Sequence, residues 1–425
     1  MLLGFSFENF ASFYHETIFS MLASKKDEFL DLNTINTSHG RLLKSALIFG
    51  PNGSGKTNWV KALNFMQDMV FTSVIDKNIL KRNENFKFFD SSYSQPTSFE
   101  ISFIQNGIAY EYGFKILKDE IIEEWLNKKA KRTVPIFYRN NSDWNSIELR
   151  GSMKKAEKIK KFTRKDSLFL TTAAMFNIDV AEEILNWFSN LYILVDDFGS
   201  PKLTVDYIQE DIDNKAKVLN QLKIADIGIE DFDIQIRELD VDNDLKEKLI
   251  QSAQKNLSLN SMDKFKVKRK AIDLKTKHHV YDEDKKIAYD IELSFLKYQS
   301  KGTIKFFELL GPILDVLENG KVLVVDEIDS RLHCGIVEYI LEMFNSIDKN
   351  SKNGQLICNT HNVLLLDEDI RRDQIWFIQK DNYGESELYS LDDFKDVRKD
   401  DPKLKKYLLG VYGAIPNMNR DDIYG

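Results

Sequence analysis

The residues best suited to chemistry form one short segment, Gly50-Pro51-Asn52-Gly53-Ser54-Gly55-Lys56-Thr57. Its glycines let the backbone fold around a phosphate group without Cβ clashes, and N–H groups at a helix N-terminus point at negative charge. The spacing predicts that Lys56 reaches the β- and γ-phosphates of ATP and that the Thr57 hydroxyl ligates Mg²⁺. We expect the nucleotide contacts to come from Gly50, Asn52, Gly53, Ser54, Gly55, Lys56, Thr57 and Asn58.

The flanking residues favour this interpretation over a Gly-rich turn that merely caps a helix. An apolar run at 46–49 precedes the segment, and the apolar residues that follow it recur at helical spacing. Strand, Gly-rich loop and helix in this order is the context in which the spacing binds phosphate.

Two adjacent acids follow a second apolar run. Residues 322–325 read as a buried parallel strand that delivers Asp326 and Glu327 to the edge of a sheet. Asp326 would hold Mg²⁺ opposite Thr57, and Glu327 would orient or deprotonate the attacking water. The alternative is a pair of ordinary surface acids.

A histidine follows the next predicted strand, at 355–359. There the imidazole of His361 would contact the γ-phosphate, although a lone histidine more often has a structural role. Residues 374–378 predict a further strand. Because strands alternate with helices here, we expect a largely parallel sheet with ligands at the carboxyl ends of its strands.

A second anion site is predicted where Ser300-Lys301-Gly302 opens a helical segment. A serine and a glycine at a helix start expose N–H groups to an anion. A serine and a glycine at a helix start are common. The pattern supports an anion site here only because it precedes the strand that ends in Asp326 and Glu327.

The remaining pattern divides the chain into three segments. In residues 1–115 we expect two short antiparallel strands around Asn9 and Ser12, and a hairpin that turns at Asn106-Gly107. Residues 116–275 read as a mainly helical insertion and the expected partner-binding region. Residues 276–425 complete the nucleotide-binding half. The predicted fold class is therefore α/β, a P-loop NTPase interrupted by an insertion.

The order of these motifs resembles an ABC-type ATPase head of the RecF and chromosome-maintenance kind. The motifs are GPNGSGKT at 50–57, SKG at 300–302, VLVVDEID at 322–329 and NTH at 359–361. The chain more closely resembles the AAA15/AAA21 bacterial ATPases, through residues 5–10, 372–377, 387–391 and 407–416. Such ATPases are found in anti-phage systems such as AbiL and PARIS, paired with a separate small effector that is often of nuclease type.

This resemblance implies a composite site. Two subunits would sandwich two ATP molecules, and Ser300, Lys301 and Gly302 of one subunit would face the γ-phosphate held by Lys56 of the other. It also implies a homodimer of heads, or a higher oligomer, and a separately encoded effector. Gln95 is a candidate for the Q-loop glutamine of such heads.

Basic residues gather at 154–165 and 264–270 and leave nucleic-acid binding open, with solvated helix faces as the alternative. A net charge of −8 argues against nucleic-acid binding over the whole surface. Two cysteines fit a reducing cytoplasm, and no apolar run is long enough to cross a membrane. A zinc set of His333, Cys334, Cys358 and His361 lacks paired ligand spacing.

Two functions follow from the sequence. The first is an ATPase that acts as sensor and scaffold of an anti-phage, abortive-infection system. The alternative is a DNA-repair-like ATPase of RecF type whose turnover DNA stimulates. The acidic net charge and the lack of a sustained heptad pattern favour the first, and the basic runs favour the second.

Overall fold

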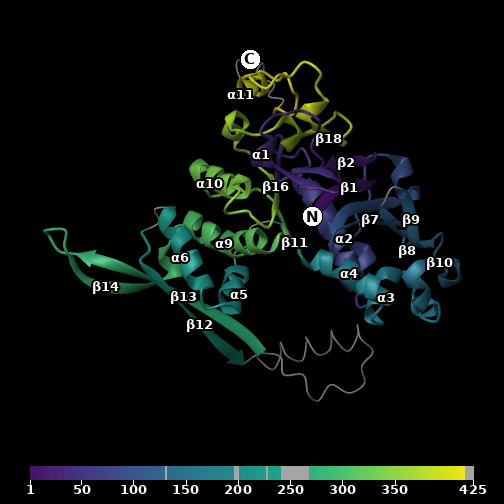
Figure 1. Ribbon diagram of the computed structural model, residues 1–425, viewed down its shortest axis with the longest axis horizontal. Helices are drawn as coiled ribbons and strands as arrows, with labels where there is room; N and C mark the ends of the chain where they lie inside the picture. The colour runs from purple at the N-terminus through teal and green to yellow at the C-terminus, as the bar shows by residue number, and fades with distance from the viewer. Residues whose placement is uncertain (130–131, 196–200, 226–227, 241–267, 417–425) are drawn as a thin grey trace. The chain divides into compact units, whose positions relative to one another are not determined.

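Two β-sheets with a helix between them make up most of the first of two units (Figure 1). The computed structural model describes residues 1–129, 132–195, 201–225, 228–240 and 268–416. The first unit comprises Met1–Asp196, Val316–Ser330 and Val337–Gly425. The second comprises Asp197–Asp315 and Arg331–Ile336.

The first sheet is antiparallel and, within the described residues, has seven strands. In β6, Thr97, Phe99, Ile101 and Phe103 are buried and alternate with partly exposed residues, as expected of a strand with one face on a core. In spatial order the strands are β10 (Ile147–Leu149), β9 (Thr133–Arg139), β8 (Glu120–Lys129), β7 (Ile108–Leu117), β6 (Thr97–Gln105), β1 (Leu2–Glu8) and β2 (Thr17–Ser20).

The second sheet is parallel except at one edge. Its central strands are buried along their whole length, because elements cover both faces of a parallel sheet. In spatial order the described strands are β11 (Leu191–Leu194), β15 (Val322–Val325), β16 (Gln355–Asn359), β5 (Ser45–Phe49), β17 (Ile375–Lys380) and the antiparallel β18 (Ser386–Ser390). The carboxyl ends of β5, β15, β16 and β17 therefore meet at one edge.

Helix α2 (Lys56–Thr72) packs against both sheets in one continuous core. The rings of Trp59 and Phe5 of β1 are nearly perpendicular, with centroids 5.9 Å apart, and the same core includes Ile48 of β5 and Ile357 of β16. Helices α3 (Phe169–Met175) and α4 (Asp179–Ser189) belong to this core as well. Because α2 is buried between two sheets, its first residue has a defined position. The loop that precedes it is positioned in the same way.

The second unit combines helices with a three-stranded antiparallel sheet. Phe307 contacts Phe232 and Phe295, with ring centroids 5.6 and 5.0 Å apart. Its described elements are α5 (Lys202–Glu210), α6 (Asn214–Ile224), β12 (Asp231–Asp240), β13 (Lys268–Tyr281), β14 (Ile287–Ser294), α8 (Phe295–Tyr298) and most of α9 (Lys301–Asn319). The remaining described α-helices and strands are α1 (Leu30–Asn33), β3 (Thr34–Thr37), β4 (Gly40–Leu43), α10 (Cys334–Asn345) and α11 (Lys403–Leu408).

The strands, loop and helix expected around residue 50 are confirmed, as are the N-terminal pair and the 99–114 hairpin. Asn106 and Gly107 have φ of 50° and 76°, the left-handed values that a two-residue hairpin turn requires. The α/β fold of the P-loop NTPase kind is therefore present.

The prediction that residues 116–275 form a mainly helical insertion is wrong for the described residues. Strands β8, β9 and β10 extend the first sheet, so no boundary falls at 115, and β12 and β13 form a sheet in the second unit. The second unit also runs on to Asp315, past the boundary predicted at 275. Residues 241–257, predicted as helix, and 264–267 of the second basic run lie outside the described residues.

Candidate functional site

The loop between β5 and α2 depends on its glycines. Gly53 and Gly55 have φ of 76° and 115°, which residues with a Cβ rarely adopt. A Cβ on Gly50 would lie 2.3 Å from the Ile378 carbonyl oxygen, and one on Gly55 would lie 2.5 Å from Ser386 Oγ. Close neighbours and positive φ together explain why glycine stands at these positions.

Lys56 is the first residue of α2, and its side chain reaches back to the start of this loop. Its Nζ donates to the carbonyl oxygens of Gly50 and Pro51 at 2.7 and 3.1 Å. Burial lowers the Lys56 pKa to about 8, although the nearby carboxylates of Glu327, Asp326 and Asp329 act in the opposite direction. An incoming phosphate would offer this ammonium group a charged partner in place of two neutral carbonyls.

Ser54 adds an unused hydroxyl to the loop. The residue is 2% exposed, and within the described residues its Oγ has no hydrogen-bond partner. A buried hydroxyl without a partner costs free energy, so an oxygen-rich ligand in the loop would satisfy it. Together with Lys56 and the glycines, Ser54 fits a bound phosphate chain.

Thr57 and Asp326 come together as the sequence predicts. The Thr57 hydroxyl donates to Asp326 Oδ1 at 3.3 Å, so two oxygen atoms from α2 and the end of β15 converge. Mg²⁺ needs few protein ligands when phosphates and water complete its octahedron. The pair therefore fits Mg²⁺, and the described residues contain no group of three or more His, Cys, Asp or Glu arranged to bind a metal.

Asn359 links the two acids. Its side-chain amide donates to Asp326 Oδ1, and its side-chain oxygen accepts the backbone N–H of Glu327. Glu327 has φ of 48°, an unusual value for a residue with a Cβ. Asn359 thus holds the predicted Mg²⁺ ligand and the turn that carries the predicted base.

His361 lies beside the loop at the end of β16. Its backbone N–H donates to both carboxylate oxygens of Asp329, at 3.1 and 3.2 Å. Burial and the charge of Lys56 lower the His361 pKa below its usual value, which favours the neutral imidazole in the free protein. A neutral ring can donate or accept one hydrogen bond at each nitrogen, depending on its tautomer.

A cleft of about 1160 Å³ joins His361 to the first half of the loop. Its far wall comes from the C-terminal segment, where Tyr407 of α11 stacks on Phe377 of β17 with ring centroids 5.5 Å apart. The cleft is lined by residues 49–54, Thr360, His361, Val363, residues 379–381, Tyr407, Leu408 and residues 413–416. The cleft is large enough for a nucleotide, although Lys56, Thr57, Asp326 and Glu327 are not among the residues that line it.

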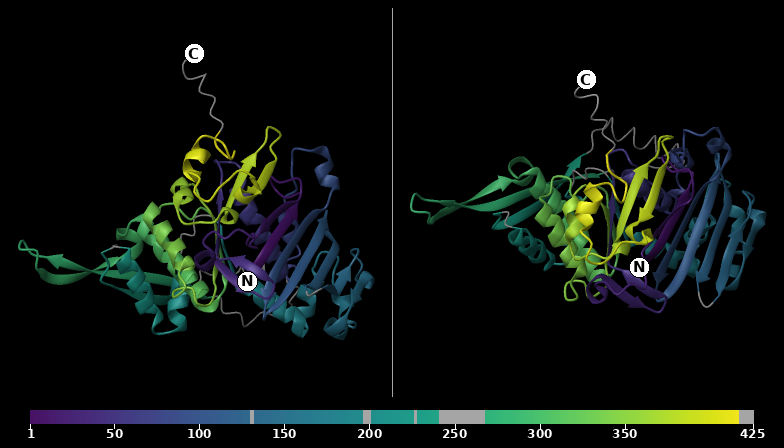
Figure 2. Two further views of the ribbon diagram at one scale, coloured as in Figure 1. Left: turned by 45° about the horizontal axis from the view of Figure 1, so that its top comes forward. Right: turned by 90° about the horizontal axis from the view of Figure 1, so that it is seen from above.

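Three side chains brace the loop from the opposite side. Ser386 Oγ of β18 donates to the Ser54 carbonyl oxygen at 2.6 Å and lies 2.8 Å from Ser12 Oγ, to which it is hydrogen-bonded. The Asn58 side-chain amide donates to the same Ser12 hydroxyl at 2.9 Å. Figure 2 shows the β17–β18 hairpin beside strands β1 and β2. Asn58 thus supports the loop here, and its contact with nucleotide stays a prediction.

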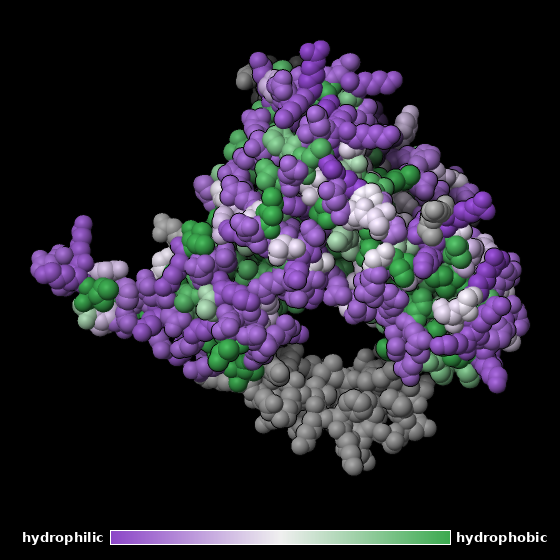
Figure 3. Space-filling view, viewed as in Figure 1, coloured by the Kyte–Doolittle hydropathy of each residue, from purple (hydrophilic) through white to green (hydrophobic). Residues whose placement is uncertain are grey.

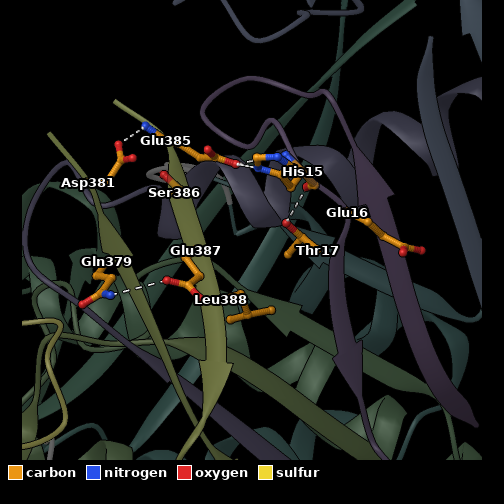
Figure 4. Close-up of a pocket in the computed structure, with 9 residues that line it drawn as sticks. All are labelled: His15, Glu16, Thr17, Gln379, Asp381, Glu385, Ser386, Glu387 and Leu388. Atoms are coloured by element: carbon orange, nitrogen blue, oxygen red, sulfur yellow. Dashed lines mark hydrogen bonds and ion pairs between the residues drawn. The ribbon is translucent and has the colours of Figure 1, made fainter. Parts of the chain in front are cut away.

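A smaller cavity of about 400 Å³ adjoins this brace (Figure 4). His15 Nδ1 and Glu385 Oε1 are hydrogen-bonded at 2.6 Å in its lining, and Glu16, Asp381 and Glu387 also line it. Four carboxylates repel a phosphate group, so this cavity is a poor anion site.

The signature residues Ser300, Lys301 and Gly302 lie in the second unit, at the start of α9. Ser300 Oγ accepts the Thr303 N–H at 3.0 Å and so caps the helix, while a Cβ on Gly302 would lie 2.7 Å from the Arg331 carbonyl oxygen. Their contact with ATP stays a prediction. Gln95 is exposed, and its carbonyl oxygen accepts the Asn9 amide at 3.1 Å.

Four supporting residues were not in the predicted site: Ser12, Asp329, Asn359 and Ser386. Asn359 and Asp329 lay within recognised motifs, where a polar residue after a buried strand was a usable signal. Ser12 and Ser386 carry no such signal, because a serine near either end of the chain is common and their contact depends on the fold.

A family model described as "AAA domain, putative AbiEii toxin, Type IV TA system" matches residues 45–367, from β5 to just beyond His361. This chain belongs to that family, AAA_21. No curated protein matches the chain. The AAA_21 match covers the loop, both acids and His361, and makes the protein a P-loop ATPase by family. Within the described residues, no helix is long and apolar enough to cross a membrane.

Proposed function

We propose that this AAA_21 protein hydrolyses ATP at the site between α2, β15 and β16. The observation that supports this most directly is the chain of contacts from Thr57 through Asp326 and Asn359 to Glu327, beside Lys56. A merely structural loop would not need two oxygen ligands, a carboxylate and a buried ammonium group at one point.

Each residue then has a defined task. Lys56 binds the β- and γ-phosphates, and the loop N–H groups and Ser54 Oγ complete the cradle. Thr57 and Asp326 hold Mg²⁺, which neutralises charge on the phosphates. Glu327 orients the attacking water and accepts its proton, while the imidazole N–H of His361 donates a hydrogen bond to a γ-phosphate oxygen.

We further propose an ABC-type head that completes its site across a homodimer. The support is the resemblance of the SKG segment at 300–302 to the signature of such heads. Ser300, Lys301 and Gly302 at the start of α9 would supply N–H groups and a hydroxyl to the γ-phosphate held by the other subunit. Hydrolysis would then be coupled to dimer opening.

The proposed cellular role is that of sensor and scaffold in a cytoplasmic anti-phage, abortive-infection system with a separate effector, which is expected to be a nuclease in some systems. The toxin–antitoxin wording of the AAA_21 family description supports this role. The alternative is a RecF-like ATPase stimulated by DNA, which the basic run at 154–165 favours.

The deciding experiment is steady-state Mg-ATP turnover by the purified chain, with and without linear duplex DNA. Lys56→Ala should abolish nucleotide binding, and Glu327→Gln should bind ATP normally with turnover reduced by about a hundredfold or more. ATP binding by Lys56→Ala, or parental turnover by Glu327→Gln, would contradict the assigned site. Turnover indifferent to DNA supports the sensor, and strong stimulation supports the repair-like alternative.

A further inference from the structure

Two phenylalanine rings stack on the surface of the first unit. Phe162 and Phe176 are 56% and 46% exposed, their ring centroids are 5.3 Å apart and their planes differ by 22°. Met175 beside them is 58% exposed. Most large apolar side chains of this unit are buried, so a stacked aromatic pair open to water indicates a binding surface.

Basic residues lie close to Phe162 in the sequence, and one of them contacts its ring. Residues 151–165 contain seven lysines and arginines and one acid, Glu157. Lys161 Nζ lies 5.3 Å from the centroid of the Phe162 ring, and the side chains of Lys154 and Lys158 are exposed. Figure 3 shows hydrophobic surface bordered by hydrophilic residues on the part of this unit that carries α3.

Intramolecular ion pairs neutralise only part of this charge. The acidic partners in the described residues are Asp179 for Lys155, Glu157 for Lys160, Asp166 for Arg164 and Glu120 for Lys165. The Lys155–Asp179 pair is 68% and 79% exposed, and such pairs contribute little and exchange readily. Within the described residues, Lys154, Lys158 and Lys161 have no acidic partner within ion-pair distance.

Residues 151–165, which carry this charge, are anchored to the core of the first unit. Met153 and Ala156 are fully buried in the main core. The Arg164 guanidinium donates to the carbonyl oxygens of Ser73 and Val74, just after α2, at 3.0 and 2.8 Å. A ligand would therefore meet a surface that is already ordered, which lowers the entropy cost of binding.

We propose that the surface formed by Lys154, Lys158, Lys161, Phe162 and Phe176, the stacked platform, binds single-stranded nucleic acid. Unpaired bases stack on exposed aromatic rings, and the phosphates between them are attracted to lysines. In a duplex each base is already stacked between neighbouring bases and cannot stack on a protein ring. A surface that binds bases through its aromatic rings therefore favours single strands. The platform uses none of the ATP-site residues, so its function is independent of the proposed hydrolysis.

The test is fluorescence anisotropy of fluorescein-labelled 20-nucleotide oligo-dT and oligo-U at several salt concentrations, with a duplex of equal length beside them. Phe162→Ala/Phe176→Ala should weaken single-strand binding by at least about fivefold, the effect of losing one stacked base. Tyr289→Ala, which removes another exposed ring, is the matched control and should bind like the parent.

Charge is tested with Lys158→Glu/Lys161→Glu against the exposed control pair Lys87→Glu/Lys395→Glu. The logarithm of the association constant falls linearly with the logarithm of the salt concentration. Loss of two phosphate contacts should make this slope less steep by about 1.4, and the control pair should keep the parental slope. Unchanged melting temperature and ATP turnover of the variants show that they fold. Lys56→Ala should bind the oligonucleotide like the parent even if it no longer binds ATP.

Three outcomes would overturn the proposal. They are no oligonucleotide binding by the parent at low salt, parental affinity of the double phenylalanine variant, and duplex affinity equal to or above that of the single strand. Preference for either oligo-dT or oligo-U supports the stacked platform. It also shows whether the platform binds DNA or RNA.

Discussion

Asn359 is the residue on which both acids of the site depend. Its side chain bonds Asp326 with its amide group and the Glu327 backbone with its oxygen. These two hydrogen bonds hold the Asp326 carboxylate and the Glu327 backbone in position. At the scale of single residues, the site is therefore a connected network and not a set of independent groups.

Asn359→Ala removes both contacts and should lower kcat for ATP hydrolysis by about a hundredfold, since small misplacements of reacting groups carry that cost. KM should change little, because Lys56 and the loop remain. Asn359→Asp keeps the acceptor for Glu327 but repels Asp326, so it separates the two roles. Turnover of Asn359→Ala at the parental rate would remove Asn359 from the mechanism.

The protonation of Lys56 predicts a pH dependence of ATP binding. In the free protein its pKa is lowered to about 8 by burial, so a growing fraction is neutral above pH 8. Bound phosphates favour the charged form and raise this pKa, so binding takes up a proton above pH 8. The dissociation constant, measured in EDTA, should therefore rise with pH above 8, by up to about tenfold per unit.

Lys56→Arg is the control for this titration, because a guanidinium group stays charged over the whole range. If it binds ATP, its affinity should not change between pH 7 and 9.5. A flat profile for the parent protein would show that Lys56 is fully charged in the free loop.

At the scale of elements, the loop is positioned by strands from both ends of the chain. The turn between β1 and β2 supplies Ser12, and β18 supplies Ser386, whose N–H also donates to the Ser12 carbonyl oxygen at 2.7 Å. Both meet the loop at Gly55 and Ser54. Movement of the β17–β18 hairpin would therefore be transmitted to the phosphate cradle.

Ser386→Ala should raise KM for ATP about fivefold with little change in kcat, the effect of about one hydrogen bond. Ser390 provides the matched control, because it is a buried serine on the same strand that bonds the Ile375 carbonyl oxygen instead of the loop. The test compares KM and kcat of the two variants by steady-state kinetics and their stability by melting temperature. An equal KM for the two variants would mean that Ser386 acts only on stability.

Strand β8 explains why the predicted insertion was wrong. Its inward position 124 is a glutamate that is fully buried, where it accepts the N–H groups of Phe169 and Leu170 and lies 3.8 Å from the Arg139 guanidinium. The sequence pattern 120–129 therefore lacks clean alternation of apolar and polar residues. A charge buried inside a sheet is tolerated only because distant residues pair with it.

At the scale of the whole molecule, the proposed dimer predicts a change of mass. Glu327→Gln with Mg-ATP should elute at twice the monomer mass of 49.5 kDa in size-exclusion chromatography with light scattering, because ATP is bound but not hydrolysed. Lys56→Ala should not shift under the same conditions. A Glu327→Gln protein that binds ATP yet keeps one mass with and without it would contradict the ATP sandwich.

The sequence by itself predicted the chemistry that we propose for the site. The loop at 50–57, the acids after β15 and the histidine after β16 are local patterns, in which a buried strand ends and polar residues follow, so neighbouring residues suffice to predict them. Only the tertiary structure decided what supports them. The contacts of Ser12 with Ser386, of Glu124 with Arg139 and of Phe162 with Phe176 join separate elements, and such contacts form only when packing brings those elements together.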